Sequence, residues 1–309
     1  MDYFFSFVLP AYKEKYLKEA IQSILQQSYT HFELVIVNDA SPENLDEIVN
    51  SFNDSRIVYH HNEENIGGKN LVKNWNHCLS LSKGDFLILA SDDDVYEKDF
   101  LSEINRLIAL YPDINIYKAR TKKINKKNKI IEIDPHFSQY SSLIDFMYNR
   151  RKGMISCVSN YVFNNKVLKK AGGFIDFPAA WHSDAATVDF MAKNGIAITN
   201  QVLFSFRSSE INISNQKNIA LAYSKLQATI LYDRWFDENI NLQPQNEDEA
   251  FLVNQILEKR KTDREYMTYL IVRSFSLFKA LIILYKIYKM SFLPKKQVIR
   301  LAVKYVLGR

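Results

Sequence analysis

Three consecutive carboxylates, Asp92 to Asp94, directly follow an apolar run and are the residues in this chain best suited to chemistry. Like charges packed beside a buried segment destabilise one another unless a cation compensates them. Hard oxygen ligands suit Mg²⁺ or Mn²⁺, which typically take one or two carboxylates together with substrate phosphates. The triplet therefore predicts a divalent-metal site. The structural alternative is an acidic turn that only caps a helix beginning near Glu97.

Two other segments carry polar groups that suit a nucleotide. Asp39 follows the apolar run 33–37, and a carboxylate there could accept hydrogen bonds from a base or a ribose. An aspartate is also common in ordinary turns, which need no ligand. Residues 65–70 (NIGGKN) form a glycine-containing loop with Lys69 at a helix start, a weak motif for phosphate or base contacts.

The elements that must position these residues alternate along the first hundred positions. Short apolar runs predict strands, and apolar residues spaced three and four apart predict helices between them. The predicted strands are 4–9, 33–37, 56–60 and 85–90, and the predicted helices include 16–27 and 69–82. This pattern indicates an α/β fold with a mostly parallel central sheet flanked by helices. Ligands bind at the carboxyl ends of such strands, where Pro10, Tyr12, Asp39 and Asp92 fall.

The second half of the chain is organised differently. Residues 115–121 and 129–133 predict strands around a polar turn, 156–163 predicts another strand, and Gly172 and Gly173 end a following helix. After residue 215 the pattern is helical throughout. We expect a catalytic domain over 1–215, with a nucleotide-binding half (1–115) and an acceptor-side half (116–215), followed by a helical region over 216–309.

Composition excludes several classes of protein. The chain has 309 residues, of which 47% are apolar and 24% charged, so it can bury a large core and is not a disordered or low-complexity protein. Two cysteines, Cys78 and Cys157, make neither a disulfide framework nor a zinc site. Asp2 replaces the basic start of a signal peptide, so a reducing cytoplasm is the expected location.

Positive charge is concentrated near the C-terminus. Residues 251–309 hold 13 Lys and Arg against three acids, whereas the remainder is mildly acidic and unlike a nucleic-acid-binding surface. Within 266–309 no uncharged run reaches the 18 residues of a membrane span. Lysines recur on one side of amphipathic patterns, which predicts helices on an anionic membrane surface. A helical subdomain packed on the catalytic domain or on a second subunit is an equal alternative.

Five segments, taken in order, resemble family 2 glycosyltransferases. Residues 7–12 (FVLPAY) and 37–41 (VNDAS) are similar to the family's "IPxYN…VDDGS" opening. Residues 65–70 resemble a shortened "NxGxxxARN" loop, and 89–94 (LASDDD) resemble the "LDxDD" metal motif. Residues 163–174 (FNNKVLKKAGGF) are similar to the acceptor-side segment that ends in "GGF". The resemblance covers about 1–210, and the ordered set is more specific than any single motif.

The resemblance implies a Rossmann-like GT-A fold, a nucleotide-sugar donor, a divalent ion and inversion at the anomeric carbon. The implied donor-side roles are Pro10, Tyr12 and Asp39 at uracil and ribose, Lys69 near the base or diphosphate, Asp92 at the ribose or the ion, Asp93 at the sugar, and Asp94 directly on the metal. The ion and nearby cations would stabilise the negative charge of the departing diphosphate.

Inversion requires a general base, and the family places an aspartate ahead of a helix some ten residues after GGF. Here Trp181, His182 and Ser183 precede Asp184, which the resemblance makes the candidate base. Without the family, Asp184 would be read as a helix N-cap, and Trp181 could stack on an acceptor sugar or simply pack.

The chain departs from the family pattern at two positions. Ser183 stands where the residue before the base is usually Glu, so a carboxylate that could contact the acceptor is missing. Arg207, Ser208 and Ser209 stand where the family often has R-x-H. Arg207 can still pair bidentately with phosphate, but metal coordination from that segment is in doubt.

The sequence therefore predicts an inverting, metal-dependent glycosyltransferase of bacterial surface-polysaccharide synthesis. A UDP-sugar is the favoured donor, and the acceptor is a saccharide or a lipid-linked saccharide at the inner face of the membrane. Two alternatives stay open. One is a nucleotidyltransferase, although residues 11–14 lack the Gly-rich phosphate loop that it would need. The other is a catalytically silent scaffold of a membrane assembly.

Overall fold

The computed structural model describes residues 2–208, 219–273, 275–289 and 293–307. The chain divides into two compact units, one formed by Met1–Asp176 with Ser183–Glu210 and the other by Phe177–His182 with Ile211–Arg309. The predicted boundary between residues 215 and 216 lies outside the described residues. Residues 177–182, which the sequence assigns to the catalytic domain, belong to the second unit.

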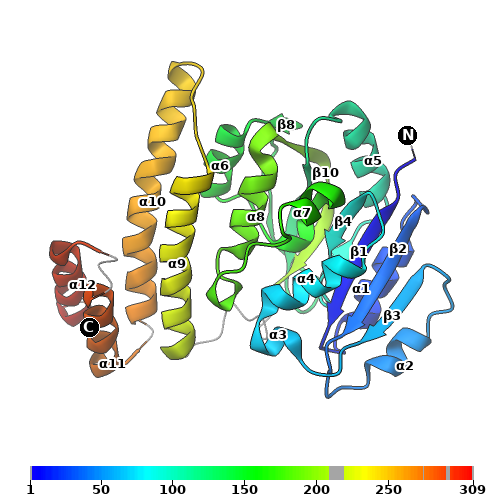
Figure 1. Ribbon diagram of the computed structural model, residues 1–309, viewed down its shortest axis with the longest axis horizontal. Helices are drawn as coiled ribbons and strands as arrows, with labels where there is room; N and C mark the ends of the chain where they lie inside the picture. Colours follow the sequence, from blue (N-terminus) through cyan, green and yellow to red (C-terminus); the bar gives the residue numbers. More distant parts are fainter. Residues whose placement is uncertain (1, 209–218, 274, 290–292, 308–309) are drawn as a thin grey trace. The chain divides into compact units, whose positions relative to one another are not determined.

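The first unit is built on one mixed sheet with the strand order β3-β2-β1-β4-β9-β6-β10-β5, to which β7 and β8 add at β6 and β10. The strands are β1 (Phe5–Ala11), β2 (Phe32–Asn38), β3 (Ile57–His61), β4 (Phe86–Leu89), β5 (Val95–Tyr96), β6 (Ile116–Ile124), β7 (Ile130–Ile133), β8 (Tyr140–Ser141), β9 (Tyr161–Asn164) and β10 (Ile196–Arg207). The first four in this order are parallel, and Figure 1 shows β1, β2 and β3 side by side. Strand β9 is antiparallel to both of its neighbours, and β6 and β10 are parallel.

Helices connect and cover these strands. They are α1 (Leu17–Leu25), α2 (Leu45–Asn50), α3 (Ile66–Lys69), α4 (Leu71–Leu81), α5 (Phe100–Leu110), α6 (Leu143–Arg151), α7 (Asn165–Lys170) and α8 (Ser183–Met191), with short 3₁₀ turns η1 (Val158–Asn160) and η3 (Ala192–Asn194). Helix α1 buries Leu17, Ile21 and Ile24, whose spacing puts them on one face of a helix, in the same core cluster as Phe5 and Phe7 of β1.

The second unit is helical. It contains η2 (Pro178–Ala180), α9 (Ile219–Asn239), α10 (Glu247–Arg273), α11 (Leu277–Lys289) and α12 (Lys295–Leu307). Arg260 of α10 binds Asp233 of α9 at 3.0 Å and Asp237 at 2.9 Å, so charge pairs as well as apolar contacts join these helices. A separate core cluster unites the four long helices. None of the helices described here is long and apolar enough to span a membrane.

The predicted fold class is confirmed by this architecture. The parallel strands of the first hundred residues, the hairpin of β6 and β7 and the helical C-terminal region all form where the sequence places them. Two details differ. The loop predicted over 65–68 contains a one-turn helix that Asn65 caps, and the strand predicted over 156–163 is reduced to Tyr161–Asn164 after a 3₁₀ turn.

Candidate active site

Parallel pairing brings three sequence-predicted segments to one edge of the sheet. Ala11 at the end of β1 lies opposite Asn38 at the end of β2, and Val8 of β1 lies opposite Leu89, the last residue of β4. The residues that follow these ends meet there. The Asp92 carboxylate accepts hydrogen bonds from the backbone N–H of Tyr12 at 3.1 Å and of Lys13 at 2.9 Å. The acidic triplet is thereby fastened to the end of the first strand.

Pro10 and Tyr12 lie beside this junction, as predicted. Pro10 is a partly buried residue of β1, and Tyr12 is 38% exposed just beyond it. The Tyr12 carbonyl accepts a hydrogen bond of 2.6 Å from the Ser41 hydroxyl, in the turn after β2. An accessible ring at the edge of the sheet is suitably placed for contact with a planar ligand.

Asp39 holds the loop that leads into α3. Its carboxylate accepts hydrogen bonds from the side-chain amide of Asn62 at 2.7 Å, the Ile66 N–H at 2.9 Å and the Gly67 N–H at 2.8 Å. Asp39 is only 3% exposed, and a β-carbon added at Gly67 would lie 2.8 Å from its Oδ2 atom. The glycine is therefore needed for this close approach. An ionised carboxylate has about four lone-pair directions, so three donors leave room for one more.

Lys69 lies at the exposed end of α3. Its ammonium group pairs with the Glu64 carboxylate, and both side chains are more than two-thirds exposed. An exposed pair of this kind contributes little to stability and can exchange partners readily. The cation is thus placed on the loop held by Asp39, with access to solvent.

The three carboxylates of the triplet have different surroundings. Asp92 and Asp93 are half-buried, and Asp93 accepts a hydrogen bond from the Ser91 hydroxyl. Asp94 is 2% exposed and accepts a hydrogen bond of 2.9 Å from the Arg207 backbone N–H. Burial, reinforced by the charge of Asp93, holds the pKa of Asp94 well above its usual range, and burial also raises the pKa of Asp92.

This arrangement fits a hard divalent cation. Several carboxylate oxygens lie in one short segment, and a cation beside them would offset the burial and mutual repulsion that raise their pKa values. Throughout the described part of the chain, no group of three or more His, Cys, Asp or Glu side chains is placed to hold a metal ion by itself, as a cage of protein ligands would. Mg²⁺ and Mn²⁺ do not need such a cage when substrate phosphates supply ligands.

Arg207 is placed differently from the predicted phosphate contact. Its side chain is 1% exposed, and its Nε donates to the Asp93 carbonyl at 2.7 Å. One terminal nitrogen binds Glu19 at 2.8 Å, the other binds Asn128, and the guanidinium lies 4.2 Å from the ring centre of Tyr16. A diphosphate contact would require Arg207 to leave these partners. The His that often follows in the family corresponds to Ser209, outside the described residues.

Asp184 lies in the first turn of α8, whose first residue is Ser183. Its carboxylate accepts a hydrogen bond of 2.8 Å from the backbone N–H of Ala185. Burial raises the pKa of Asp184, and the positive charge of Arg150 partly offsets that rise. Arg150 in turn pairs with the buried carboxylate of Asp189 at 2.7 Å. A carboxylate with a raised pKa is a stronger base than an ordinary aspartate.

The partly buried thiol of Cys157 connects the two acidic regions. Burial raises its pKa, and the charges of Asp94 and, more weakly, of Asp184 raise it further. Both carboxylates therefore lie within electrostatic reach of the same group. Trp181 and His182, which precede Asp184 in the chain, pack within the helical unit instead. The indole of Trp181 lies under Lys225, and His182 stacks on Tyr232.

Several contributors to the site have no signal in the sequence. These are Glu19 and Asn128, which hold the Arg207 guanidinium; Asn62, which binds Asp39; Ser159, a hydrogen-bond partner of Asp94; and Arg150, beside Asp184. Each acts through a contact between segments far apart in the chain. No residue spacing in a single segment indicates such contacts.

A model of the family described as "Glycosyl transferase family 2" matches residues 6–172. That range is more than half of the chain and contains Pro10, Asp39 and the acidic triplet. The chain belongs to glycosyl transferase family 2. The matched range contains nearly the whole nucleotide-binding half and most of the acceptor-side half, whereas Asp184 and Arg207 lie beyond it.

Individual members of the family are similar over shorter segments. Glycosyltransferase GlyG of Streptococcus pneumoniae serotype 4 is 33% identical over 107 residues, which are 34% of this chain and 35% of GlyG. WcaA of Escherichia coli K12, assigned to colanic acid biosynthesis as a glycosyl transferase, is 34% identical over 100 residues, or 31% of this chain and 35% of WcaA. The aligned segments thus span about a third of each relative.

The fold is similar to that of a solved structure that contains a nucleotide sugar. Residues 1–349 of Staphylococcus aureus TarS, determined with UDP-GlcNAc, superpose with a TM-score of 0.62, covering 99% of this chain and 92% of the TarS chain. The sequences are 17% identical, so the likeness concerns the fold alone. It extends over nearly the whole chain, and the central sheet flanked by helices is therefore the GT-A fold.

Proposed function

We propose that this chain transfers a sugar from a nucleotide-diphosphate sugar to a hydroxyl group of a saccharide or lipid-linked acceptor, with inversion, in bacterial polysaccharide synthesis. The observation that carries the proposal is the fastening of Asp92 to the end of β1, with Asp94 and Asp184 both within electrostatic reach of Cys157. In a family 2 member, this supports a cation site and a base in one region. The assignment of WcaA to colanic acid biosynthesis supports a polysaccharide product.

The donor is proposed to bind along the edge formed by β1, β2 and the triplet. Pro10, Tyr12 and Asp39 would contact the base and ribose, and Lys69 would reach the diphosphate from the α3 loop. The UDP-GlcNAc in the TarS structure supports a UDP-sugar as the donor. The Asp39 carboxylate accepts three hydrogen bonds from the protein and has one lone-pair direction left. That direction suits an N–H of uracil.

The triplet is proposed to hold Mn²⁺ or Mg²⁺, with Asp94 and Asp92 as the ligands and Asp93 towards the sugar. When bound, the ion would stabilise the negative charge of the departing diphosphate. The role of the protein itself is to hold these carboxylates in position. The Tyr12 and Lys13 amides hold Asp92, and the Arg207 amide holds Asp94. We propose that Arg207 supports this site by holding the Asp93 carbonyl in position through a hydrogen bond.

Asp184 is proposed to remove the proton from the acceptor hydroxyl as the new bond forms. Its Oδ1 atom is held by the Ala185 N–H, which fixes the plane of the carboxylate. The raised pKa makes this group a better proton acceptor than an ordinary aspartate. The residue before the base is the buried Ser183. The acceptor therefore has no contact here with the Glu that is usual in the family.

The same proposal includes a cytoplasmic location at the inner face of the membrane. Cys78 and Cys157 are both free thiols, as a reducing compartment requires. A lipid-linked acceptor would also have to be reached at a membrane surface.

Calorimetric titration of UDP, GDP, CDP and TDP, with and without Mn²⁺, tests the donor site. We expect one diphosphate to bind in a Mn²⁺-dependent manner and Asp94→Asn to abolish that binding. Asp113→Asn, a change at an exposed aspartate outside the site, is the matched control. Asp184→Asn should keep nucleotide binding and lose sugar transfer by about 10²-fold or more, because removal of a general base has that effect.

Full transfer by both Asp94→Asn and Asp184→Asn, with the true donor and acceptor, would overturn the mechanism. The absence of binding by any of the four diphosphates would instead favour a catalytically silent scaffold with a GT-A fold. Binding without transfer by the wild-type chain to any acceptor would point the same way.

A further inference from the structure

Helix α11 has two apolar faces. The inward face consists of Ala280, Ile283, Leu284 and Ile287, which are at most 3% exposed and belong to the core of the helical unit. The outward face consists of residues that are 38 to 75% exposed: Leu277, Phe278, Leu281, Ile282, Tyr285 and Tyr288. At 100° per residue they occupy an arc of about 140°. A helix that only packs on its own unit would carry polar residues there.

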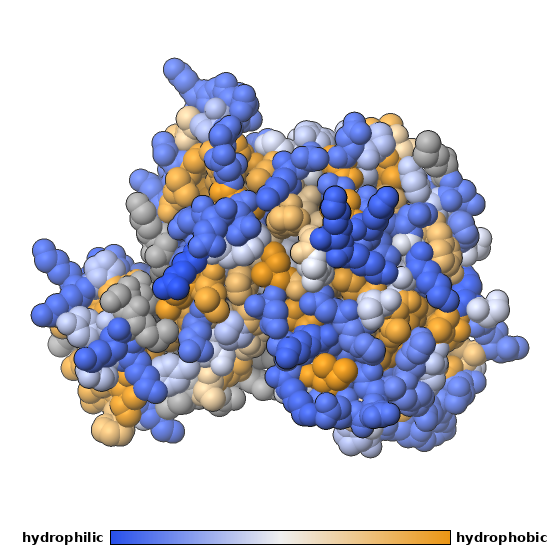
Figure 2. All heavy atoms as spheres, in the orientation of Figure 1, coloured by the Kyte–Doolittle hydropathy of each residue, from blue (hydrophilic) through white to orange (hydrophobic). Residues whose placement is uncertain are grey.

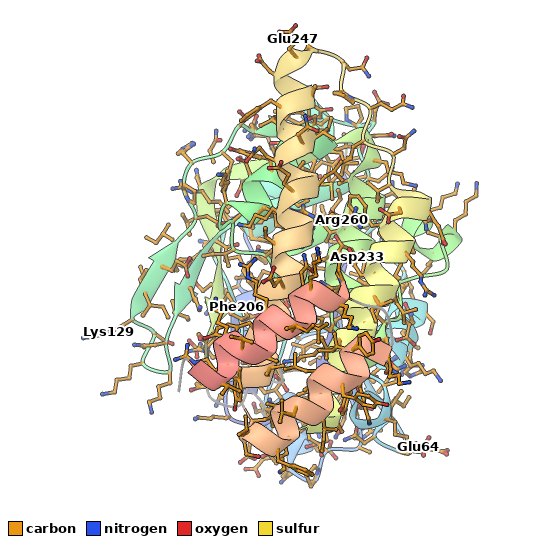
Figure 3. The ribbon with its side chains drawn as sticks, turned by 90° about the vertical axis from the view of Figure 1, so that its left-hand side faces the viewer. Glu64, Lys129, Phe206, Asp233, Glu247 and Arg260 are labelled. Atoms are coloured by element: carbon orange, nitrogen blue, oxygen red, sulfur yellow. The ribbon has the colours of Figure 1, made fainter. Side chains whose placement is uncertain are left out.

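Helix α12 repeats this arrangement. Val298, Leu301 and Tyr305 face the same core cluster as the inward residues of α11. On another side of the helix, Ile299, Val303 and Val306 are 50 to 53% exposed. Figure 3 shows the two helices next to one another, crossing in front of α10 at the end opposite Glu247. Together, these exposed apolar residues of α11 and α12 form the outward face.

Cations border this apolar surface. Between residues 275 and 307 the sequence has seven Lys and Arg and no Asp or Glu: Lys279, Lys286, Lys289, Lys295, Lys296, Arg300 and Lys304. On α11 the three lysines lie within about 80° of one another, along one edge of the outward arc. In Figure 2 apolar side chains gather at the lower left, over α11, next to hydrophilic ones.

We propose that the outward face of α11 and α12 docks on an anionic phospholipid surface, with both helices lying in the plane of the interface. The apolar side chains would enter the boundary between headgroups and acyl chains, while the lysines contact lipid phosphates. The rings of Tyr285 and Tyr288 suit that boundary, because they are apolar with a polar tip. A thirteen-residue helix is about 20 Å long, shorter than the roughly 30 Å hydrocarbon core, so α11 would lie on the membrane.

Charge decides between a membrane and a second copy of the chain as the occupant. Two copies that met through this face would bring together two segments that each carry seven cations and no acids, with one of the cations, Arg300, paired to Glu265 of α10. Like charges across an interface oppose association, whereas an anionic bilayer attracts each cation. The lipid proposal deepens the membrane location in the proposed function and rests on that part of it, and it does not depend on the transfer reaction.

Flotation of the full chain with vesicles tests the proposal. We expect binding to vesicles of phosphatidylcholine with 30% phosphatidylglycerol and little binding to phosphatidylcholine alone. Leu281→Glu/Tyr285→Glu, at the centre of the outward face, should lower the partition coefficient by about tenfold or more. Lys279→Gln/Lys295→Gln/Lys296→Gln should lower it by on the order of 100-fold, since each cation contributes roughly fivefold.

Phe251→Glu is the matched control, because Phe251 is 60% exposed on α10 near Glu247, away from α11 and α12. It should bind vesicles like the wild type. Circular dichroism and Mn²⁺-dependent nucleotide binding verify that each variant is folded, and they separate failure of this proposal from failure of the donor site. Equal binding by wild type and both face variants would overturn the proposal. The proposal would also be overturned if the wild-type chain did not bind anionic vesicles but formed a dimer through Leu281 and Tyr285.

Discussion

The pKa of Asp184 depends mainly on its burial and is modified by two neighbouring charges of opposite sign. Burial raises its pKa, Arg150 lowers it, and the carboxylate of Asp189 raises it again. Since a base must be deprotonated to act, transfer should fall as the pH falls through the pKa of Asp184. The raised pKa places that fall at a higher pH than for an exposed aspartate.

Arg150→Met should therefore move the acidic limb of the kcat/KM profile upward by about one pH unit, because the charge that lowers the pKa of Asp184 is removed. Arg150→Lys keeps a positive charge and should leave the limb near its wild-type position. Initial rates between pH 4.5 and 8 measure the shift. An unchanged limb in Arg150→Met would contradict Asp184 as the titrating base. Arg150→Met also removes the ion pair to the buried Asp189 carboxylate and so lowers stability. The assays should therefore be run well below the melting temperature.

The sequence predicts individual site residues where they follow a strand. Asp39 and Asp92 end apolar runs, and parallel pairing puts such ends together whatever the loops do. Arg207 shows the limit of this reasoning. Its residue type suits phosphate, but its contacts with Glu19 and Asn128 depend on where α1 and the turn after β6 fall in space. Local spacing carries no information on those positions.

At the scale of elements, a fully buried charge pair links β6 to the residue that follows β7. Lys118 binds Asp134 at 2.8 Å, and neither side chain has any exposed surface. The Asp134 carboxylate also accepts hydrogen bonds from the N–H groups of Thr121 at 3.0 Å and Ile155 at 2.7 Å. The pair thereby joins β6 to the segment that leads to Cys157.

Lys118→Met should lower the free energy of unfolding by about 3–5 kcal/mol, because it leaves the Asp134 carboxylate buried without its cation. Lys118→Met/Asp134→Asn should recover only part of that loss, since the amide carries no charge but has one acceptor oxygen for the two N–H groups of Thr121 and Ile155. Urea denaturation of the wild type and both variants measures the difference. A double variant no more stable than the single one would show that the charge pair is not the cause.

Elements formed from one continuous pattern are predictable, and those that depend on partners are not. The strands up to β4 are apolar throughout because both of their faces are covered, so they stand out in the sequence. Strand β9 is short and antiparallel between two parallel groups, and its start is fixed by the hydrogen bond from the Tyr96 hydroxyl to the Ser159 carbonyl. A pattern of apolar residues alone extends it too far, back to Ser156.

At the scale of the whole molecule, each of the two units has a hydrophobic core of its own among the described residues. The core of the sheet contains residues from β1 to β10, and the helical core contains residues from α9 to α12. Sequence reasoning separates these regions because the pattern changes from alternating to helical. It does not find the six residues 177–182 that join the helical unit, since nothing in their composition is helical.

Calorimetric unfolding should show two transitions, because separate cores unfold as separate units. Saturating nucleotide diphosphate with Mn²⁺ should raise only the transition of the sheet unit. At a hundredfold excess over Kd the stabilisation is about 2.7 kcal/mol, a shift of roughly 5–10 °C for a unit of this size. Scans with Mn²⁺ alone are the control. A single transition that moves as a whole would contradict two independent cores.

Strand β10 has a consequence for how the protein is made. It is the last strand among the residues that the structure describes, yet it lies inside the sheet, between β6 and β5, and it supplies the Arg207 N–H that holds Asp94. During synthesis on the ribosome, β6 therefore has one unpaired edge until residues 196–207 have emerged, and such an edge attracts other strands. The nascent chain should depend on chaperones in that interval, and the acidic triplet takes its final shape only after two-thirds of the chain has been translated.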